Sequence, residues 1–404
     1  LEKQEKNSES EWKFIIGENM FITHLRLKNW RNFRNVDVKF KDVTYIMGPN
    51  ASGKSNFLDV FRFLRDIATP QGGGLQQALE SRGGMSKVRC LAARQDPKIL
   101  IEIELSENFD SEPLWRYTLE FQQESRGKHA VYVSKEDVFS FKENKRILSR
   151  PDKKDEADKR LLSQTALEQI AQNANFRGIA DFLENILYLH LVPQLLKFGN
   201  ELAVKRMTND PFGQGFLEAI ATTPEKTSNS RLKRIEGILK EVIHGMSDLK
   251  FERDEVGRPH LKMRYSHWRP NGGWQTEEEF SDGTLRMIAI LWTMLANNSV
   301  ILFEEPELSL HQAIVEKIPE LIQRAKMSKK KAGNQIFIST HSEAMLNSPV
   351  IQGQYLVLDV SDKGEGTTVS APSEEEELAL QSGATPADIL LPKTAKDINV
   401  QGCF

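Results

Sequence analysis

The stretch Gly48-Pro-Asn-Ala-Ser-Gly53-Lys54-Ser55 matches the phosphate-loop pattern GxxxxGK[ST]. The apolar run 43–47 before it predicts a strand, and 56–64 after it, with apolar residues at helical spacing, predicts a helix. Strand, glycine-rich loop and helix in this order are the context that the pattern requires. The alternative is an ordinary glycine-rich turn before a helix, which this context disfavours. The stretch therefore predicts a site for a nucleoside triphosphate.

Each part of the loop has an expected task at the phosphates. Glycines let the backbone wrap a phosphate, while backbone N–H groups and the helix N-terminus supply positive charge. Lys54 is expected to reach the β- and γ-phosphates, and Ser55 to be a ligand of Mg²⁺. The predicted nucleotide-binding residues here are Gly48, Asn50, Ala51, Ser52, Gly53, Lys54, Ser55 and Asn56.

A second apolar run, 300–303, ends in the carboxylates of Glu304 and Glu305. A buried strand of this kind delivers acids to the carboxyl edge of a parallel sheet, where phosphates bind in α/β folds. We expect Glu304 to hold Mg²⁺ and Glu305 to orient or deprotonate the attacking water. A solvated helix start is the alternative explanation of the acidic run.

Two further elements follow the same logic. The apolar run 334–339 precedes His341, which is either a structural histidine or a sensor of the γ-phosphate. Ser281, Asp282 and Gly283 precede an apolar helix at 287–295. They either cap that helix or present donors to a phosphate from another subunit. The expected catalytic residues are Glu305, His341 and Lys54.

Together these elements resemble the ATP-binding-cassette (ABC) superfamily in its RecF/SMC-like branch. Walker A is 48–55, the signature loop 281–286, Walker B 300–305 and the switch histidine His341. The run 21–34 also resembles the first hairpin of these heads, so the resemblance spans most of residues 20–361. It implies an α/β P-loop head with a β-rich N-terminal lobe and a helical insert. It also implies ATP, Mg²⁺ and a head-to-tail homodimer with two composite ATP sites.

The segment 304–311 resembles the OLD-like group of predicted ATPases more closely. Transporter and SMC heads usually have Asp where this chain has Glu304, a hard oxygen donor that still suits magnesium. His311 stands where those heads have an Asp-bearing loop, and it either caps and packs or acts at the dimer seam. Gln95 is the candidate for the family's magnesium-sensing glutamine.

The resemblance and the composition together predict the organisation of the chain. Expected strands lie at 21–27, 34–40, 43–47, 99–105, 115–121, 130–133, 249–253 and 260–265. Helices are expected within 156–205, including 165–172, and within 210–247. The expected parts are a polar extension 1–19, lobe I 20–155, an insert 156–265, the core 266–361 and a C-terminal segment 362–404. No sustained heptad pattern exists, which excludes long coiled-coil arms.

The composition of the 404 residues limits the partners. No apolar run approaches the ~18 residues of a membrane span, so we expect no membrane partner. The polar N-terminus is unlike a secretion signal, and two cysteines, Cys90 and Cys403, fit a reducing cytoplasm. With a net charge of −3, DNA is a possible partner only through a local basic patch.

The expected function is an ATP-dependent dimeric switch that regulates a separate effector. In OLD-like proteins such an ATPase governs a Toprim nuclease, and the roughly sixty residues after His341 are too few for that domain. We therefore expect the effector, possibly a Toprim-type nuclease, to be a separate chain, and the resemblance implies bacterial anti-phage defence as the setting. The alternative is a RecF-like DNA-repair clamp with a basic face and DNA-stimulated turnover. A non-catalytic scaffold is disfavoured by Glu305 and His341, and a transporter subunit by the Walker B variant.

Overall fold

The computed structural model describes residues 20–93, 96–124, 130–199, 209–266, 273–297, 299–308, 310–328, 334–361 and 366–394. The chain divides into two compact units. Unit 1 comprises Leu1–Ile186, Gly353–Ser373 and Lys393–Phe404, and unit 2 comprises Leu187–Gln352 and Glu374–Pro392. The lobe boundaries expected at residues 155, 265 and 361 stay predictions.

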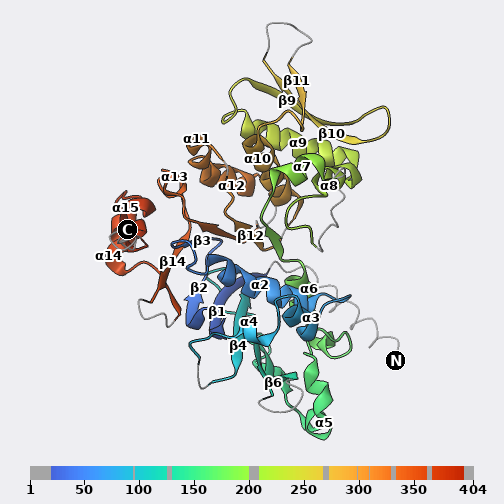
Figure 1. The fold of residues 1–404 in the computed structure, drawn as a ribbon, viewed down its shortest axis with the longest axis vertical. Coiled ribbons are helices and arrows are strands. Elements are labelled where there is room, and N and C mark those ends of the chain that lie inside the picture. Colours follow the sequence, from blue (N-terminus) through green and yellow to red (C-terminus); the bar gives the residue numbers. More distant parts are fainter. Residues whose placement is uncertain are drawn as a thin grey trace, which may run out of the picture. The chain divides into compact units, whose positions relative to one another are not determined.

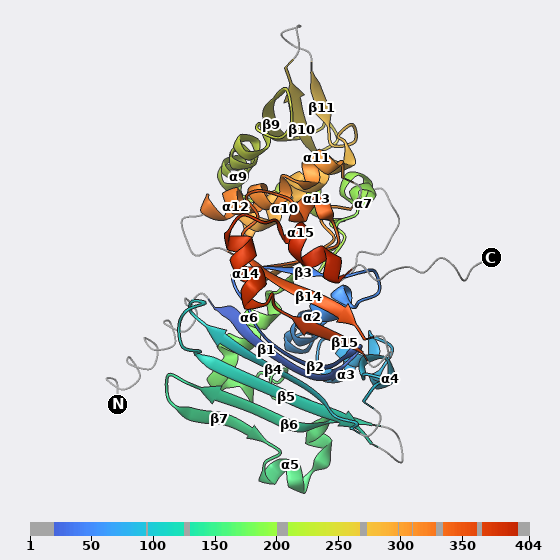
Figure 2. The same cartoon turned by 90° about the vertical axis from the view of Figure 1, so that its left-hand side faces the viewer.

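Unit 1 contains a six-stranded antiparallel sheet of order β2-β1-β4-β5-β6-β7 (Figure 2). The strands are β1 (Phe21–Trp30), β2 (Phe33–Lys39), β4 (Ile99–Ser106), β5 (Trp115–Gln123), β6 (Val131–Ser140) and β7 (Lys145–Arg150). Alternate residues of β4 are buried, as expected of a sheet with one face toward a core. The predicted β-rich N-terminal lobe is confirmed, and β7 is an additional strand.

A second layer of unit 1 carries the phosphate loop. β3 (Val43–Met47) lies parallel to β14 (Gln354–Val360), which is antiparallel to β15 (Thr367–Ser370). Helix α2 (Lys54–Ala68) buries aromatic rings, among them Phe57 against Phe33 and Phe61 against Phe40, with ring centroids 5.9 Å apart in both pairs. Each buried ring stabilises the unit by about 1.5–3 kcal/mol. The remaining helices are α3 (Leu75–Glu80), α4 (Met85–Val88), α5 (Lys153–Ala157), η1 (Lys159–Ser163), η2 (Asn173–Phe176) and α6 (Arg177–Glu184).

The helix predicted at 165–172 is wrong, because this segment forms turns. The backbone N–H groups of Ala166 and Leu167 donate to the buried carboxylate of Glu136, at 2.7 and 3.1 Å. The same carboxylate accepts from Arg150 at 3.1 Å. A distant acid on β6 therefore fixes the local backbone, which the helical spacing of apolar residues did not reveal.

Glu168, next to these turns, gives unit 1 a pH-dependent contribution to stability. Burial raises the pKa of its carboxyl from 4.5 to about 7, against the opposing effect of N–H donation from Leu75 and Thr165. The folded protein therefore holds this proton more tightly than the unfolded chain. The associated stability is complete below the unfolded pKa of 4.5 and is lost as the pH rises through about 7.

We expect Glu168→Gln to reduce the loss of folding stability that accompanies this rise in pH. Melting temperatures measured between pH 5 and pH 8 should fall more steeply for the wild type than for the variant. Parallel curves for the two proteins would mean that Glu168 does not titrate in this range.

Unit 2 combines helices with two groups of strands. Helix α9 lies against the antiparallel sheet β11-β10-β9 (Figure 1). The first part contains β8 (Leu187–Leu189), α7 (Pro193–Phe198), α8 (Phe216–Thr222), α9 (Glu225–Leu239), β9 (Met246–Arg253), β10 (Pro259–Tyr265) and β11 (Trp274–Thr276). The second contains α10 (Asp282–Ala296), β12 (Ile301–Glu304), α11 (Gln312–Val315), α12 (Ile318–Met327), β13 (Ile336–Thr340), α13 (Glu343–Leu346), α14 (Glu374–Gln381) and α15 (Pro386–Leu390). Among the described residues, no helix has the length and apolar character needed to span a bilayer.

The helical block predicted at 156–205 is wrong at residues 187–189. This segment is β8, and it pairs in parallel with β12, which in turn pairs in parallel with β13. The N–H of Leu187 donates to the carbonyl of Val300 at 2.9 Å. A three-residue apolar run takes its conformation from the partner strand, so its own residues do not distinguish strand from helix.

Candidate nucleotide site

The phosphate loop of unit 1 contains backbone conformations with positive φ. β3 is buried throughout and leads directly into the loop. Ala51 and Gly53 have φ values of 64° and 99°. A Cβ on Gly48 would lie 2.5 Å from the Ser52 hydroxyl, and one on Gly53 would lie 2.1 Å from the Asn32 amide nitrogen. Both positions therefore require glycine, and α2 begins at the next residue.

Lys54 turns back over the loop. Its Nζ donates to the carbonyls of Gly48 at 2.9 Å and Pro49 at 3.2 Å, and the residue is 6% exposed. The ammonium is thus held against the loop backbone. Ser55, by contrast, is exposed at the first turn of α2.

Asn32, in the β1–β2 turn, supports the loop and was not predicted as a site residue. Its amide nitrogen donates to the carbonyl of Ser52 at 2.9 Å and to the hydroxyl of Thr367 at 2.7 Å. Thr367 donates to the same Ser52 carbonyl at 2.9 Å. The amide of Asn56 in turn donates to Asn32 at 2.8 Å. The side chain of Asn56 is thus used inside the protein, and the signal for Asn32 lay in the hairpin sequence 21–34.

We expect Asn32→Ala to weaken nucleotide binding without abolishing it. Losing these part-buried hydrogen bonds should cost about 1–2 kcal/mol of loop positioning, or roughly 5- to 30-fold in affinity. Fluorescent nucleotide titration measures this, with Asn35→Ala, an exposed asparagine on β2, as the control. Equal nucleotide affinities of Asn32→Ala and Asn35→Ala would show that Asn32 does not support nucleotide binding.

The same hairpin also contacts α2 directly. The indole nitrogen of Trp30 donates to the carbonyl of Asn56 at 2.9 Å, and the guanidinium of Arg31 pairs with Asp59 at 2.6 Å. Burial alone would raise the pKa of Asp59, but Arg82 and Arg31 hold it below its ordinary value. The first helix and the hairpin therefore form one support for the phosphate loop.

Unit 2 brings the predicted acids and the histidine to one edge of parallel strands. Glu304 ends β12, opposite Ser339 of β13, and His341 follows β13. The Nδ1 of His341 lies 3.3 Å from the carboxylate of Glu305, and their side chains are 46% and 25% exposed. Glu305 and His341 therefore lie together within reach of solvent.

Glu305 has an unusual backbone conformation. Its φ is 43°, in the left-handed region that non-glycine residues rarely occupy. Its N–H donates to the carbonyl of Ser339 at 3.1 Å, which ties the strained residue to β13. Backbone strain of this kind concentrates at functional sites and persists where the surroundings enforce it.

Tyr188 is a second residue that the sequence analysis did not identify. Its hydroxyl hydrogen-bonds with the carboxylate of Glu304. Tyr188 lies on β8, which pairs in parallel with β12, and this pairing brings Tyr188 close to Glu304. The tyrosine holds the acid that we expected to face magnesium.

Buried polar groups lie behind this edge. The Thr340 hydroxyl donates to Glu307 at 2.5 Å, and burial raises the pKa of that carboxyl. Arg286 is 3% exposed, and its Nη2 donates to the carbonyl of Leu191 at 2.8 Å. Burial lowers the pKa of Arg286, while nearby Asp282 and Glu307 oppose that shift. Arg286, on the helix that starts at the signature loop, thus has favourable charge interactions with Asp282 and Glu307.

The signature loop begins α10 as a capped helix. The Ser281 hydroxyl accepts from the N–H of Thr284 at 3.1 Å, and Asp282 pairs with Lys197 of α7 at 3.0 Å. Gly283 is buried, and a Cβ there would lie 2.8 Å from the side chain of Leu310. Capping is therefore present, and the expected role of these residues toward a second subunit stays a prediction.

The remaining predicted site residues are His311, Gln95 and the expected magnesium ligands Ser55 and Glu304. His311 caps α11, its Nδ1 accepting from the N–H of Ala313 at 3.3 Å. Gln95 lies outside the described residues. Ser55 belongs to unit 1 and Glu304 to unit 2. A hydroxyl and a carboxylate are each hard oxygen donors of the kind that suits Mg²⁺.

The chain is similar in sequence to a family of AAA domains and to two kinds of nucleic-acid enzyme or repair protein. The family model described as "AAA domain, putative AbiEii toxin, Type IV TA system" matches residues 43–347. The chain is 22% identical to the endonuclease GajA of Bacillus cereus over 354 residues, which are 81% of this chain and 56% of that protein. It is 28% identical to the DNA replication and repair protein RecF of Roseiflexus castenholzii over 101 residues, 23% of this chain and 26% of that protein. The chain thus spans about a quarter of the length of RecF and just over half of the length of GajA.

Solved structures show the same fold. An SMC head bound to the C-terminal winged-helix domain of ScpA has a TM-score of 0.52 at 15% identity, covering 88% of this chain and 99% of that one. An SMC head with an extended coiled coil, from Pyrococcus furiosus, has a TM-score of 0.50 at 14% identity, covering 90% and 99%. The predicted ABC-type α/β head fold is confirmed.

Proposed function

This chain belongs to the AAA-domain family of P-loop ATPases, in the ABC-type branch of RecF, SMC and OLD-like proteins, and from this we propose that it binds ATP with Mg²⁺ and hydrolyses it. The observation that carries the proposal is the pair formed by Glu305 and His341, 3.3 Å apart at the carboxyl ends of neighbouring strands. A carboxylate and an imidazole held in this way can orient a water and accept its proton.

The phosphate loop would bind the nucleotide. When a triphosphate enters, Lys54 exchanges the carbonyls of Gly48 and Pro49 for phosphate oxygens, and loop N–H groups surround the phosphate. Ser55, Glu304 and Gln95 are the proposed holders of Mg²⁺. An ion held by these residues would neutralise phosphate charge during transfer.

Hydrolysis would use the strained Glu305. As the water oxygen attacks the γ-phosphorus, Glu305 takes the water proton. The bond from that phosphorus to the bridging oxygen breaks, and ADP leaves with the electron pair. His341, whose Nδ1 lies 3.3 Å from the Glu305 carboxylate, would hold that carboxylate in position.

We further propose that two copies complete each site head to tail. In this arrangement Ser281, Asp282 and Gly283 of one copy present the N-terminus of α10 to the γ-phosphate held by the other. The cap formed by Ser281 and the Asp282–Lys197 pair supports this proposal, because both fix that helix N-terminus in place.

Mixing two inactive variants tests the composite site. Lys54→Met should disable the phosphate loop and Ser281→Arg the signature loop, so each homodimer should be inactive. A mixed dimer retains one intact site, and random pairing should restore about a quarter of wild-type ATPase activity. A mixture as inactive as its components would contradict the head-to-tail arrangement.

The ATP cycle would regulate an effector of the nuclease class in phage defence. The similarity to GajA supports this setting, since it extends over 81% of this chain. Purification of Glu305→Gln from native host cells in ATP and Mg²⁺ tests it. A nuclease that accompanies the variant, and leaves when ATP is omitted, is the expected result; its absence would count against the effector.

A RecF-like DNA clamp is the second candidate, favoured by the similarity to RecF over 101 residues. It predicts ATPase turnover that rises on addition of duplex DNA and falls again at high salt. Turnover that is indifferent to DNA would leave the effector model.

A further inference from the structure

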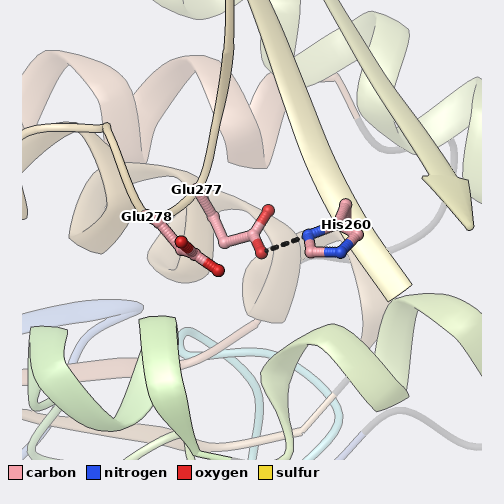
Figure 3. A group of neighbouring side chains, drawn as sticks. All are labelled: His260, Glu277 and Glu278. Atoms are coloured by element: carbon pink, nitrogen blue, oxygen red, sulfur yellow. Dashed lines mark hydrogen bonds and ion pairs between the residues drawn. The ribbon is translucent and has the colours of Figure 1, made fainter. Parts of the chain in front are cut away.

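Three side chains of types that can bind metal ions lie close together in unit 2, on β10 and on the segment before α10. They are His260 of β10 and the neighbouring Glu277 and Glu278 (Figure 3). One ligand atom from each lies within 4.8 Å of the others. None of the three belongs to the proposed ATP site.

Glu277 is the fixed member of this group. The residue is 2% exposed, and its two carboxylate oxygens lie 2.8 Å from the Nδ1 of His260 and 2.8 Å from the N–H of Leu261. A buried carboxylate is costly unless partners compensate it. Here a backbone donor and an imidazole orient it, so one ligand position is preformed.

The other two members suit the same ion. The His260 side chain is 20% exposed and Glu278 is exposed, so solvent and an ion can reach both. Around Zn²⁺, nitrogen and oxygen ligands stand at about 2.0–2.2 Å, which places neighbouring ligand atoms roughly 3–3.5 Å apart. The 2.8 Å between His260 and Glu277 needs only a small expansion to admit an ion.

We propose that His260, Glu277 and Glu278 bind a divalent first-row transition metal, with Zn²⁺ as the type ion. An imidazole with two carboxylates favours such a metal over Mg²⁺, which prefers oxygen ligands alone. The metal binds Nδ1, so the ring proton resides on Nε2, which lies 3.6 Å from the carboxylate of Asp254. Water fills the remaining positions.

The site has a structural consequence. Glu277 and Glu278 precede Ser281, which caps α10, so the ion would fasten this segment to β10. We therefore expect Zn²⁺ to raise the melting temperature of the nucleotide-free protein.

Calorimetric titration of the nucleotide-free wild-type chain with Zn²⁺ tests the site, with Mg²⁺ titrated in parallel. We expect one Zn²⁺ per chain, no comparable Mg²⁺ binding, and an affinity reduced at least about tenfold in Glu278→Gln and further in His260→Ala. Because Glu278 is exposed, we expect its variant to keep the fold even if removal of His260, which leaves Glu277 with only the Leu261 N–H as partner, does not.

His24→Ala is the matched control. The ring of His24 also lies between two carboxylates, Asp37 at 2.7 Å and Glu104 at 3.7 Å, but on opposite ring nitrogens. Its removal should leave Zn²⁺ affinity unchanged. Failure of the wild type to bind Zn²⁺, or equal binding by wild type and Glu278→Gln, would overturn the proposal. Neither result depends on ATP hydrolysis.

Discussion

Glu305→Gln should lower the ATPase rate constant by about 10²- to 10⁴-fold while leaving ATP affinity nearly unchanged. The amide keeps the size and the backbone position of the acid, including its donation to Ser339 from the main chain. It cannot accept the proton of the attacking water. Because the nucleotide is held by the phosphate loop, binding should survive, and the variant should accumulate in the ATP-bound state.

Single-turnover hydrolysis and nucleotide affinity must both be measured to separate the two effects. Glu375→Gln, an exposed acid of α14 in the same unit, is the control and should match the wild type. A Glu305→Gln variant that hydrolyses ATP at the wild-type rate would remove Glu305 from the chemistry.

Lys54→Met should differ from Glu305→Gln, because it should lose both ATP affinity and turnover. The substitution keeps the aliphatic length of the side chain and removes the ammonium that lies against the loop carbonyls. Loss of one such charged contact to the transferred phosphate costs about 10²- to 10³-fold in rate.

Equilibrium binding of a fluorescent ATP analogue and steady-state turnover measure this effect. Lys87→Ala, an exposed lysine of α4 in the same unit, controls for loss of positive charge. If Lys54→Met binds ATP as tightly as Lys87→Ala does, the loop 48–55 is not the phosphate site.

The sequence predicted those features whose cause is local. The loop 48–55 contains its own glycines, lysine and serine, and the ends of β12 and β13 each carry their polar residues directly after an apolar run. Position along the chain is enough to place such residues on one sheet edge, and the contact between Glu305 and His341 fits that expectation.

The features that the sequence could not predict depend on distant partners. The strand β8 exists because β12 pairs with it, and the turns near Ala166 follow from the carboxylate of Glu136. Asn32 supports the loop together with Thr367, 335 residues further along the chain. No local pattern contains such partners, so these residues and elements emerge only with the tertiary structure.

The native mass of Glu305→Gln, measured with and without ATP and Mg²⁺, tests the central claim most directly. An ATP-dependent dimeric switch predicts one chain per particle without nucleotide, and a particle of two chains with two bound ATP molecules when nucleotide is present. A particle whose mass is the same in both conditions would contradict the account.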